Sequence, residues 1–524
     1  MELSPIIDAL IKEFETPKPQ PKDGGMMSVS RTVSLLAVLY EKARNAVEFR
    51  AEHLVRRASI ERILKRRIII NGGSGTIAEN VVLELLWARY IDSSLIDQRK
   101  IEEIQKIIDR YLAVKHLHYD GGKQPKAVPW DTMLGLAASE IEEIIVSSKK
   151  RDALTNFFYH AIRAKINFPN QDEAYSNIQT FIAAQRAFAQ SDEPLIVYQL
   201  LKLMYQTWFA VAAEEIPAAS GTLIITLEQI HQHLKDPVGE PLFRFARKQT
   251  PAFFLIRDLF LTSDDKVRSV LEDPTVLEQK LAELAHQHYT ETRARIGRGV
   301  IRSFIYILLT KMVFAFAIEA PYDIYIAKKI RYIPIAINLL FPPILMVIVA
   351  GFISVPGADN TAKLVERIKK IIYHFNEIKE ETDAFVPVER VRRPILTAVF
   401  SLFYLFMFGA TFFFIHTVLA KLQFNIISQA VFVFFVALVV FFAYRIRQST
   451  KDYIIMDKQG ALEPVMDFLF LPILRAGRWL SNEIAKLNLL TFFFDFILEA
   501  PLKVIFEVVE EWIRFVRIKK EEIV

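Results

Sequence analysis

The chain has 524 residues, enough for two or three domains, and its net charge of only +5 does not indicate a nucleic-acid-binding protein. Apolar residues make up 52% of it and charged residues 24%, a mixture that predicts a polar part joined to a membrane part. Cysteine is absent, which excludes disulfides, thiolate catalysis and thiolate metal sites in this chain.

The N-terminal half predicts a large helical domain. Residues 1–27 combine a short amphipathic helix with a linker rich in proline and glycine. They lack the continuous apolar run of a signal peptide, so we expect the helical domain after them to stay in the cytoplasm. Residues 28–299 show three- and four-residue apolar spacing between short polar breaks, which predicts a soluble all-helical domain, either a bundle or an irregular solenoid. The expected helices include 94–118, 130–147, 153–166, 171–190, 193–213, 222–234, 251–261 and 273–299.

A glycine-rich turn in this domain has two interpretations. Gly72, Gly73 and Gly75 precede Thr76 and an expected helix, and glycines before a helix N-terminus can hold a phosphate group. No lysine follows in the position that a Walker loop requires. The favoured alternative is a turn between helices in which Thr76 is the N-cap and Glu79 completes a capping box.

Apolar runs dominate residues 300–356 and 394–445. The first region contains two candidate spans, 303–319 and 332–355, of which the first is interrupted by Lys311 and the second has Pro342 and Pro343 at its middle. The second region is a hairpin of two runs without charged residues, each long enough to cross a hydrocarbon core of about 30 Å. A buried hairpin in a soluble protein is disfavoured, because side chains on every face are apolar. Residues 357–393 form a charged amphipathic connector.

Basic residues predict the orientation of these spans. Arginines and lysines flank the start of the first span, the end of the second and both outer ends of the hairpin, so these flanks are expected in the cytoplasm. Lys328, Lys329 and Arg331 then lie outside, in conflict with the rule. Either the rule is broken locally and the first segment crosses the membrane, or this segment lies in the interface without crossing. We favour the crossing. The expected location is the plasma or inner membrane, with several crossings and with both termini in the cytoplasm.

Residues 446–524 are apolar but too often interrupted by charge for confident spans. In the last part of this region an apolar stripe lies opposite a charged face, a pattern typical of a helix in the membrane interface, with Trp512 at headgroup level. Docking of this helix onto the soluble domain is the alternative.

Polar groups within the apolar runs are the candidate functional residues. Lys311 and Glu319 stand eight residues apart and project within roughly a quarter turn of each other on a helix, so one interpretation is that they line a polar path or bind a counter-charge. The alternative, which we favour, is that Lys311 pairs with an acid from a neighbouring helix and Glu319 ends its span at the interface. Asn338, His416 and Gln429 suit interhelical hydrogen bonds.

Two further candidates, Glu499 and Asp495, come from a short sequence that weakly repeats within the chain. Glu319 is followed by Ala-Pro, and so is Glu499, with Asp495 deeper in the same apolar run. A duplicated unit is one interpretation, and shared helix-boundary chemistry is the favoured one.

Histidines occur in three H-x-H pairs, which on a helix point about 200° apart and cannot share an ion. We therefore expect no metal and no cofactor. Without a catalytic motif, an enzyme is disfavoured.

The sequence thus predicts an all-α integral membrane protein with about four transmembrane helices, a large N-terminal soluble helical domain and C-terminal amphipathic helices. We interpret it as a membrane-anchored scaffold or assembly subunit whose partners are the lipid bilayer and either another protein or a second copy of itself. The alternatives are a channel or transporter that uses the polar groups of its spans, and a membrane enzyme acting on lipid.

Overall fold

A computed structural model of the chain describes part of the sequence. The described residues are 3–15, 51–71, 77–120, 125, 127–169, 171–263, 266–326, 328, 331–351, 356–375, 385, 394–449, 453–454, 471–479, 508, 512, 515 and 516. Their regular structure is helical, as predicted, and a single isolated bridge pairs Ile166 with Phe385. Gly72, Gly73, Gly75, Thr76, Asp495 and Glu499 lie outside the described residues.

The described residues fall into two compact units. The first, which we call the helical body, comprises those of 3–248 together with Phe375, Phe385, Val508, Trp512, Phe515 and Val516. The second, which we call the apolar unit, comprises those of 249–374, 394–449, 453–454 and 471–479. The domain boundary expected at residue 299 falls inside a continuous helix of the apolar unit.

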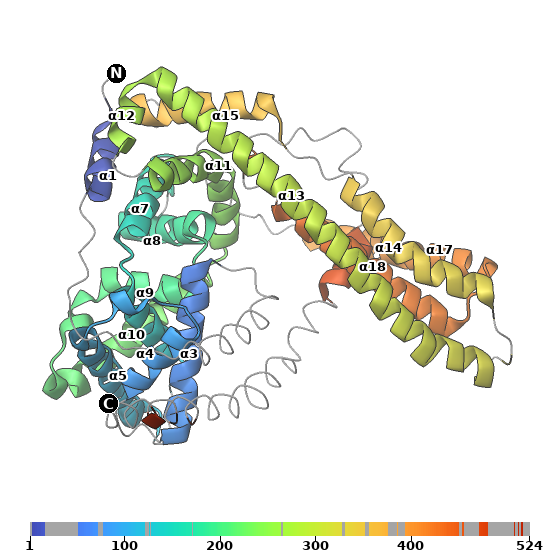
Figure 1. Cartoon of the computed structure of the whole chain (residues 1–524), viewed down its shortest axis with the longest axis horizontal. Coiled ribbons are helices and arrows are strands. Elements are labelled where there is room, and N and C mark those ends of the chain that lie inside the picture. Colours follow the sequence, from blue (N-terminus) through green and yellow to red (C-terminus); the bar gives the residue numbers. More distant parts are fainter. Residues whose placement is uncertain are drawn as a thin grey trace. The chain divides into compact units, whose positions relative to one another are not determined.

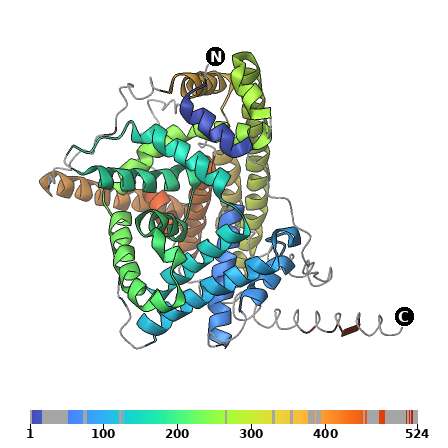
Figure 2. The same cartoon turned by 90° about the vertical axis from the view of Figure 1, so that its left-hand side faces the viewer.

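The helical body is built around α6 (Trp130–Ile145), which packs against α3 (Glu52–Asn71), α5 (Gln98–His118) and α9 (Glu193–Met204). Figure 1 labels α3, α5 and α9, and Figure 2 shows these helices from another side, in blue to green. Leu136 and Ile141 of α6 have no exposed surface, so this helix is the centre of the core. The remaining helices of the body are α1 (Pro5–Glu15), α4 (Ile77–Trp87), α7 (Lys149–Arg163), α8 (Glu173–Ala184), α10 (Ile216–Leu234) and the first part of α11 (Gly239–Ser263). Shorter turns are η1 (Ser93–Leu95), η2 (Gln185–Ala189), η3 (Gln206–Ala210) and η4 (Ala213–Glu215).

Aspartates set the beginnings of several helices. Asp97, Asp172 and Asp192 each accept a hydrogen bond from a backbone N–H in the first turn of α5, α8 and α9. Such caps satisfy donors that a helix cannot satisfy internally, and each contributes about 1 kcal/mol. Local chemistry therefore explains why these helices begin where they do.

Several sequence-based helix boundaries differ from the structure, two of them within the stretch 193–263. The helix expected to begin at Pro251 begins twelve residues earlier, at Gly239, and contains Pro251 in its interior. A proline in a helix removes only one hydrogen bond, and here the flanking residues Ala252 and Phe253 are buried and hold the helix together. The helix expected to continue to residue 213 ends at Met204 and is followed by the 3₁₀ turn η3.

The apolar unit is organised along α13 (Pro274–Phe314), which extends for about 60 Å (Figure 1). Asp273 caps its N-terminus. The helix passes into two π-helical turns, η6 (Ala315–Glu319) and η7 (Tyr322–Ile326). Preceding it is α12 (Val267–Glu272), and α15 (Ala358–Tyr373) packs along its first half.

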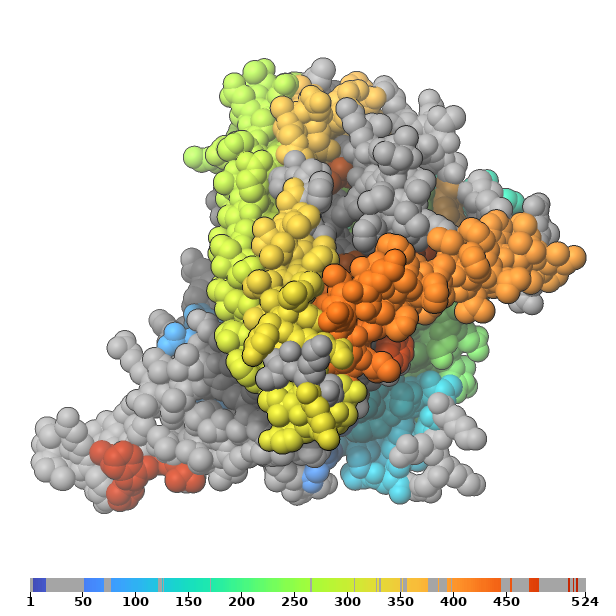
Figure 3. All heavy atoms as spheres, turned by 90° about the vertical axis from the view of Figure 1, so that its right-hand side faces the viewer, coloured from blue at the N-terminus to red at the C-terminus, as the bar shows by residue number. Residues whose placement is uncertain are grey.

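Alongside the second half of α13 lie α14 (Tyr332–Gly351) and α18 (Ile426–Ser449), with α14 packed against both (Figures 1 and 3). Pro342 and Pro343 are inside α14, which stays continuous. In contrast, α17 (Pro394–Lys421) is mostly exposed, with Phe406 at 69% and Phe413 at 71%.

Three helical segments are long and apolar enough to cross a membrane: Pro274–Ile326, Pro394–Lys421 and Ile426–Ala443. The apolar part of α14, Tyr332–Ile348, is shorter. Membrane association is thus indicated by composition, while the count of four crossings stays a prediction.

Candidate functional site: a buried charged cluster between apolar helices

The residues singled out in the first two candidate spans meet in one buried cluster. Lys311 lies on α13, Glu319 at the end of η6 and Asn338 on α14, and their exposed fractions are 0%, 1% and 1%. Three different elements therefore bring one positive, one negative and one amide group into an apolar interior. We call these three residues, with the Ser428 carbonyl, the Lys311 cluster.

An ion pair forms the centre of the cluster. Lys311 Nζ donates to Glu319 Oε1 at 3.0 Å, and Asn338 Nδ2 donates to Glu319 Oε2 at 2.6 Å. The same amide nitrogen donates to the backbone carbonyl of Ser428 on α18 at 3.1 Å. Both carboxylate oxygens are thus satisfied, and α13, α14 and α18 are linked through one group.

The ammonium group has an aromatic neighbour as well. Lys311 Nζ lies 4.7 Å from the ring centroid of Phe435 on α18, a cation–π distance. An isolated charge in such surroundings costs several kcal/mol, whereas an ion pair with further hydrogen bonds offsets much of that cost. The two charges of the cluster are therefore paired with each other, whereas the Oδ1 of Asn338 is buried without a hydrogen-bond partner among the described residues.

The geometry corrects the favoured interpretation of Lys311 and Glu319. Lys311 does not pair with an acid from a separate helix; its partner is Glu319 in the continuation of its own helix. Glu319, which was expected to end its span at the interface, is buried within the protein. The π-helical turn η6, in which the hydrogen-bond pattern is wider than in an α-helix, carries Glu319 toward α14. Sequence spacing alone did not reveal this turn.

A second set of polar contacts joins the two loops of the unit. Asp323 is 1% exposed and accepts from Asn425 Nδ2 at 2.7 Å, and Asn425 also caps α18 by accepting from the Ser428 N–H. Arg331 donates to the Gln423 carbonyl at 2.7 Å. The segment after α13 and the loop between α17 and α18 therefore lie at the same end of this helix group.

His416 and Gln429 form the remaining pair. His416 Nδ1 lies 2.6 Å from Gln429 Oε1, joining α17 to α18 by the interhelical hydrogen bond expected for such residues.

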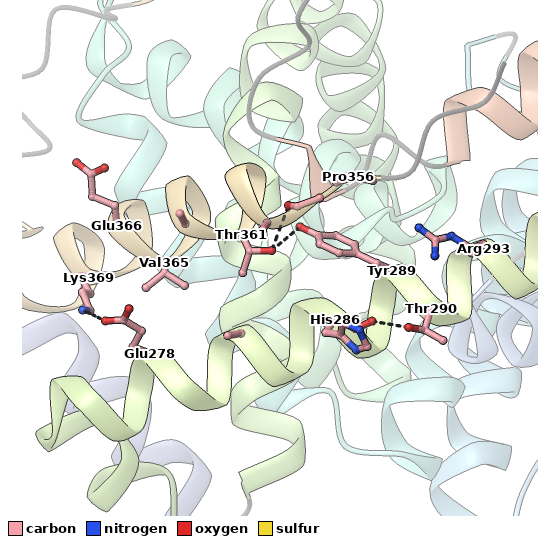
Figure 4. A pocket seen from close by; sticks show the side chains of 14 residues that line it. Glu278, His286, Tyr289, Thr290, Arg293, Pro356, Thr361, Val365, Glu366 and Lys369 are labelled. Carbon is pink, nitrogen blue, oxygen red and sulfur yellow. Dashed lines mark hydrogen bonds and ion pairs between the residues drawn. The ribbon is translucent and has the colours of Figure 1, made fainter.

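A cleft between α13 and α15 was not found from the sequence. It has a volume of about 640 Å³ and is lined by side chains of both charges, as Figure 4 shows. Lys369 pairs with Glu278 at 2.5 Å across one end, and Asn360 donates to the Tyr289 hydroxyl at 2.8 Å near the other. Arg293 lines the cleft but is exposed. The contacts hold α15 against α13.

Buried ion pairs in the helical body were also missed. Glu84 has no exposed surface and pairs with Arg66 and with Arg67, the latter at 2.7 Å. Glu142 of α6 is bonded to Arg56 at 3.0 Å, and burial raises its pKa. The basic run 56–67 thus faces carboxylates of other helices. An acidic residue flanked by apolar ones on an expected core helix was the available signal.

His53 lies near these arginines, and its pKa departs from the ordinary value. Burial, and then the charges of Arg151, Arg56 and Arg57, lower its pKa to about 3. Its Nε2 is buried and has no hydrogen-bond partner among the described residues. His53 is therefore a neutral, packed side chain next to a cationic group of arginines.

Neither the Lys311 cluster nor the buried ion pairs of the helical body have the arrangement of a catalytic centre. Within the described residues there is no set of three or more histidine, aspartate and glutamate side chains positioned for a metal ion. Comparison of the chain with protein families, with curated proteins and with solved structures found no match.

Proposed function

We propose that this chain is a membrane-anchored helical scaffold, in which the apolar unit crosses the bilayer four times and the helical body presents a cytoplasmic surface to a protein partner. The observation that carries the proposal is that the two charges of the Lys311 cluster are buried and paired with each other. Its charges bond to each other and to helices α14 and α18, which suits a junction that fastens an anchor. A channel or transporter instead needs polar groups that line a continuous path for the solute.

Several features support the four crossings. At 20 residues, α14 spans about 30 Å, which matches a hydrocarbon core. The contacts of Asp323 with Asn425 and of Arg331 with Gln423 put both short loops at one end, as two consecutive helical hairpins require. Exposed arginines at the membrane-entering part of α13 favour a cytoplasmic start. These are Arg293, Arg295, Arg298 and Arg302.

Reconstitution of the full chain into liposomes tests the scaffold against a channel or transporter. We expect solute and ion flux no greater than in protein-free vesicles. Lys311→Met is the matched variant: in a conduit it changes the flux, and in a scaffold it changes only stability. Flux that depends on Lys311 would overturn the proposal.

Site-specific photo-crosslinking in the native membrane tests the partner. A photoreactive residue replaces Leu203 or Ile225, apolar side chains of the helical body that are 68% and 59% exposed. We expect both positions to yield the same discrete protein adduct, at saturable stoichiometry. Phe406, exposed to a similar degree on the lipid-facing α17, is the control position. If neither body position gives a protein adduct, the chain does not present a docking surface there.

A further inference from the structure

A groove runs along the hairpin between α17 and α18. It has a volume of about 510 Å³ and is closed on one side by the helix of residues 471–479. Its walls are apolar, including Phe412, Leu419 and Val433, with Trp479 at one margin. Gly477 places this third wall directly on α18, because a Cβ there would lie 2.3 Å from the Ala437 carbonyl oxygen.

One polar pair interrupts the apolar lining. His416 and Gln429 both line the groove, and they are bonded to each other across the two helices. No aspartate, glutamate, lysine or arginine is among the described residues that line it. The groove therefore has the polarity of a neutral amphiphile: a long apolar channel with a single uncharged hydrogen-bonding position.

The hydrogen bonds of Gln429 determine which partner His416 requires. Gln429 Nε2 donates to the Phe424 carbonyl at 3.0 Å, so its Oε1 is the atom that faces His416. An amide oxygen only accepts, and His416 Nδ1 must therefore carry the proton. In neutral imidazole the other nitrogen is then an acceptor. The His416 side chain is exposed, and its Nε2 makes no hydrogen bond among the described residues, so a donor from outside the chain can reach it.

The position of this acceptor within the groove fits a lipid. His416 and Gln429 lie within about two turns of the loop that joins the helices, whereas the lining continues along α18 from Ile426 to Ala437, a rise of about 16 Å. A headgroup near the interface and one chain directed toward the bilayer centre match this arrangement. The groove is open to its surroundings beside Ile426 and Trp479, whose side chains are 75% and 64% exposed. A second lipid chain can therefore remain in the bilayer.

We propose that this groove binds a neutral acylglycerol with a free hydroxyl group, of the diacylglycerol class, whose hydroxyl donates a hydrogen bond to Nε2 of His416. Phosphatidylcholine has only accepting oxygens and no N–H or O–H group, so it cannot replace that donor. An anionic headgroup finds no cation in the described lining. The proposal rests on the membrane placement of α17 and α18 proposed above and adds a specific ligand to it.

Trp479 supplies the readout. The full chain is placed in phosphatidylcholine nanodiscs that contain diacylglycerol with brominated chains, which quench nearby tryptophans. Two matched probes carry the same brominated chains: the methyl ether of that diacylglycerol, which lacks only the donor, and phosphatidylcholine. Subtraction of the signal of Trp479→Phe isolates this residue from the other tryptophans.

We expect diacylglycerol to quench Trp479 at a mole fraction roughly three- to tenfold lower than its methyl ether, the difference that one neutral hydrogen bond makes. In His416→Leu the two lipids become equal. In Ala430→Phe, which fills the groove, quenching by both is weakened. Should the His416 variant not incorporate, the comparison of the two lipids on the unmodified chain still decides.

Equal quenching by all three brominated lipids would overturn the proposal while leaving the membrane placement intact. If no brominated chain quenches Trp479 at all, the placement of the hairpin in the bilayer fails with it. The two failures are therefore distinguishable.

Discussion

Removal of one partner of the Lys311–Glu319 pair should destabilise the apolar unit more than removal of both. In Lys311→Met, the Glu319 carboxylate stays buried with Asn338 as its only remaining donor within the cluster. In Glu319→Gln, the Lys311 ammonium loses its counter-charge and keeps only neutral partners, the new amide oxygen and the face of Phe435 at 4.7 Å. Breaking a buried pair in this way costs about 3–5 kcal/mol, because an uncompensated charge is left behind.

The double variant Lys311→Met/Glu319→Gln leaves no charge in the cluster. The new amide can still accept a hydrogen bond from Asn338, and the methionine side chain fills the space of the lysine stem. We expect its free energy of unfolding to lie within about 1 kcal/mol of the unmodified chain, since replacing both members of a buried ion pair is often neutral. The sum of the single effects therefore exceeds the effect of the double variant by several kcal/mol.

The absence of cysteine makes the measurement direct. Ile305 on α13 and Ile344 on α14 are 50% and 48% exposed, so cysteines introduced there accept a donor and an acceptor dye. Loss of energy transfer during SDS titration in mixed micelles reports separation of the two helices. If the double variant is as unstable as the sum of the singles, the ion pair is not what links these helices.

The remaining predictions concern both units. His53, whose pKa is lowered from 6.5 to about 3, stays neutral in the folded chain while the unfolded chain takes up a proton below pH 6.5, so stability falls with falling pH across that window by up to about 1.4 kcal/mol per pH unit. His53→Leu should remove that slope in urea unfolding followed by tryptophan fluorescence; an unchanged slope would assign it to other groups. Glu84→Gln leaves Arg66 and Arg67 without their carboxylate and should cost about 3 kcal/mol in the same assay, with Glu79→Gln as the control; equal midpoints for the two variants would contradict this. Gly477→Val should detach the helix of residues 471–479 from α18, because its Cβ meets the Ala437 carbonyl, and limited proteolysis should then cleave near Trp479; unaltered protection would show that the contact yields without cost.

Much of the local structure followed from the sequence. Three- and four-residue apolar spacing predicted the helices of the body, and those expected to begin at residues 171 and 193 begin at Glu173 and Glu193. The long uncharged runs predicted the apolar helices α17 and α18. These features depend on neighbours along the chain, so one sequence is enough to detect them.

The Lys311 cluster was predicted from the sequence only in part. Lys311 and Glu319 stood out because charged residues are rare in apolar runs, and the structure brings them together. That they bond to each other depends on the π-helical turn η6, and Asn338 joins them only because α14 packs against α13. Periodicity assumes a regular α-helix and cannot anticipate such a turn.

The sequence by itself determined which segments are helical and which are apolar enough for a bilayer. The tertiary structure alone decided where the charges go: Glu142 meets Arg56 across 86 positions of the chain, and His416 meets Gln429 only through the register of the hairpin. The physical reason is the distance along the chain over which each kind of interaction acts. Backbone hydrogen bonds and apolar periodicity act over three or four residues, whereas a buried charge or amide requires a partner in space, which only the packing of distant helices supplies.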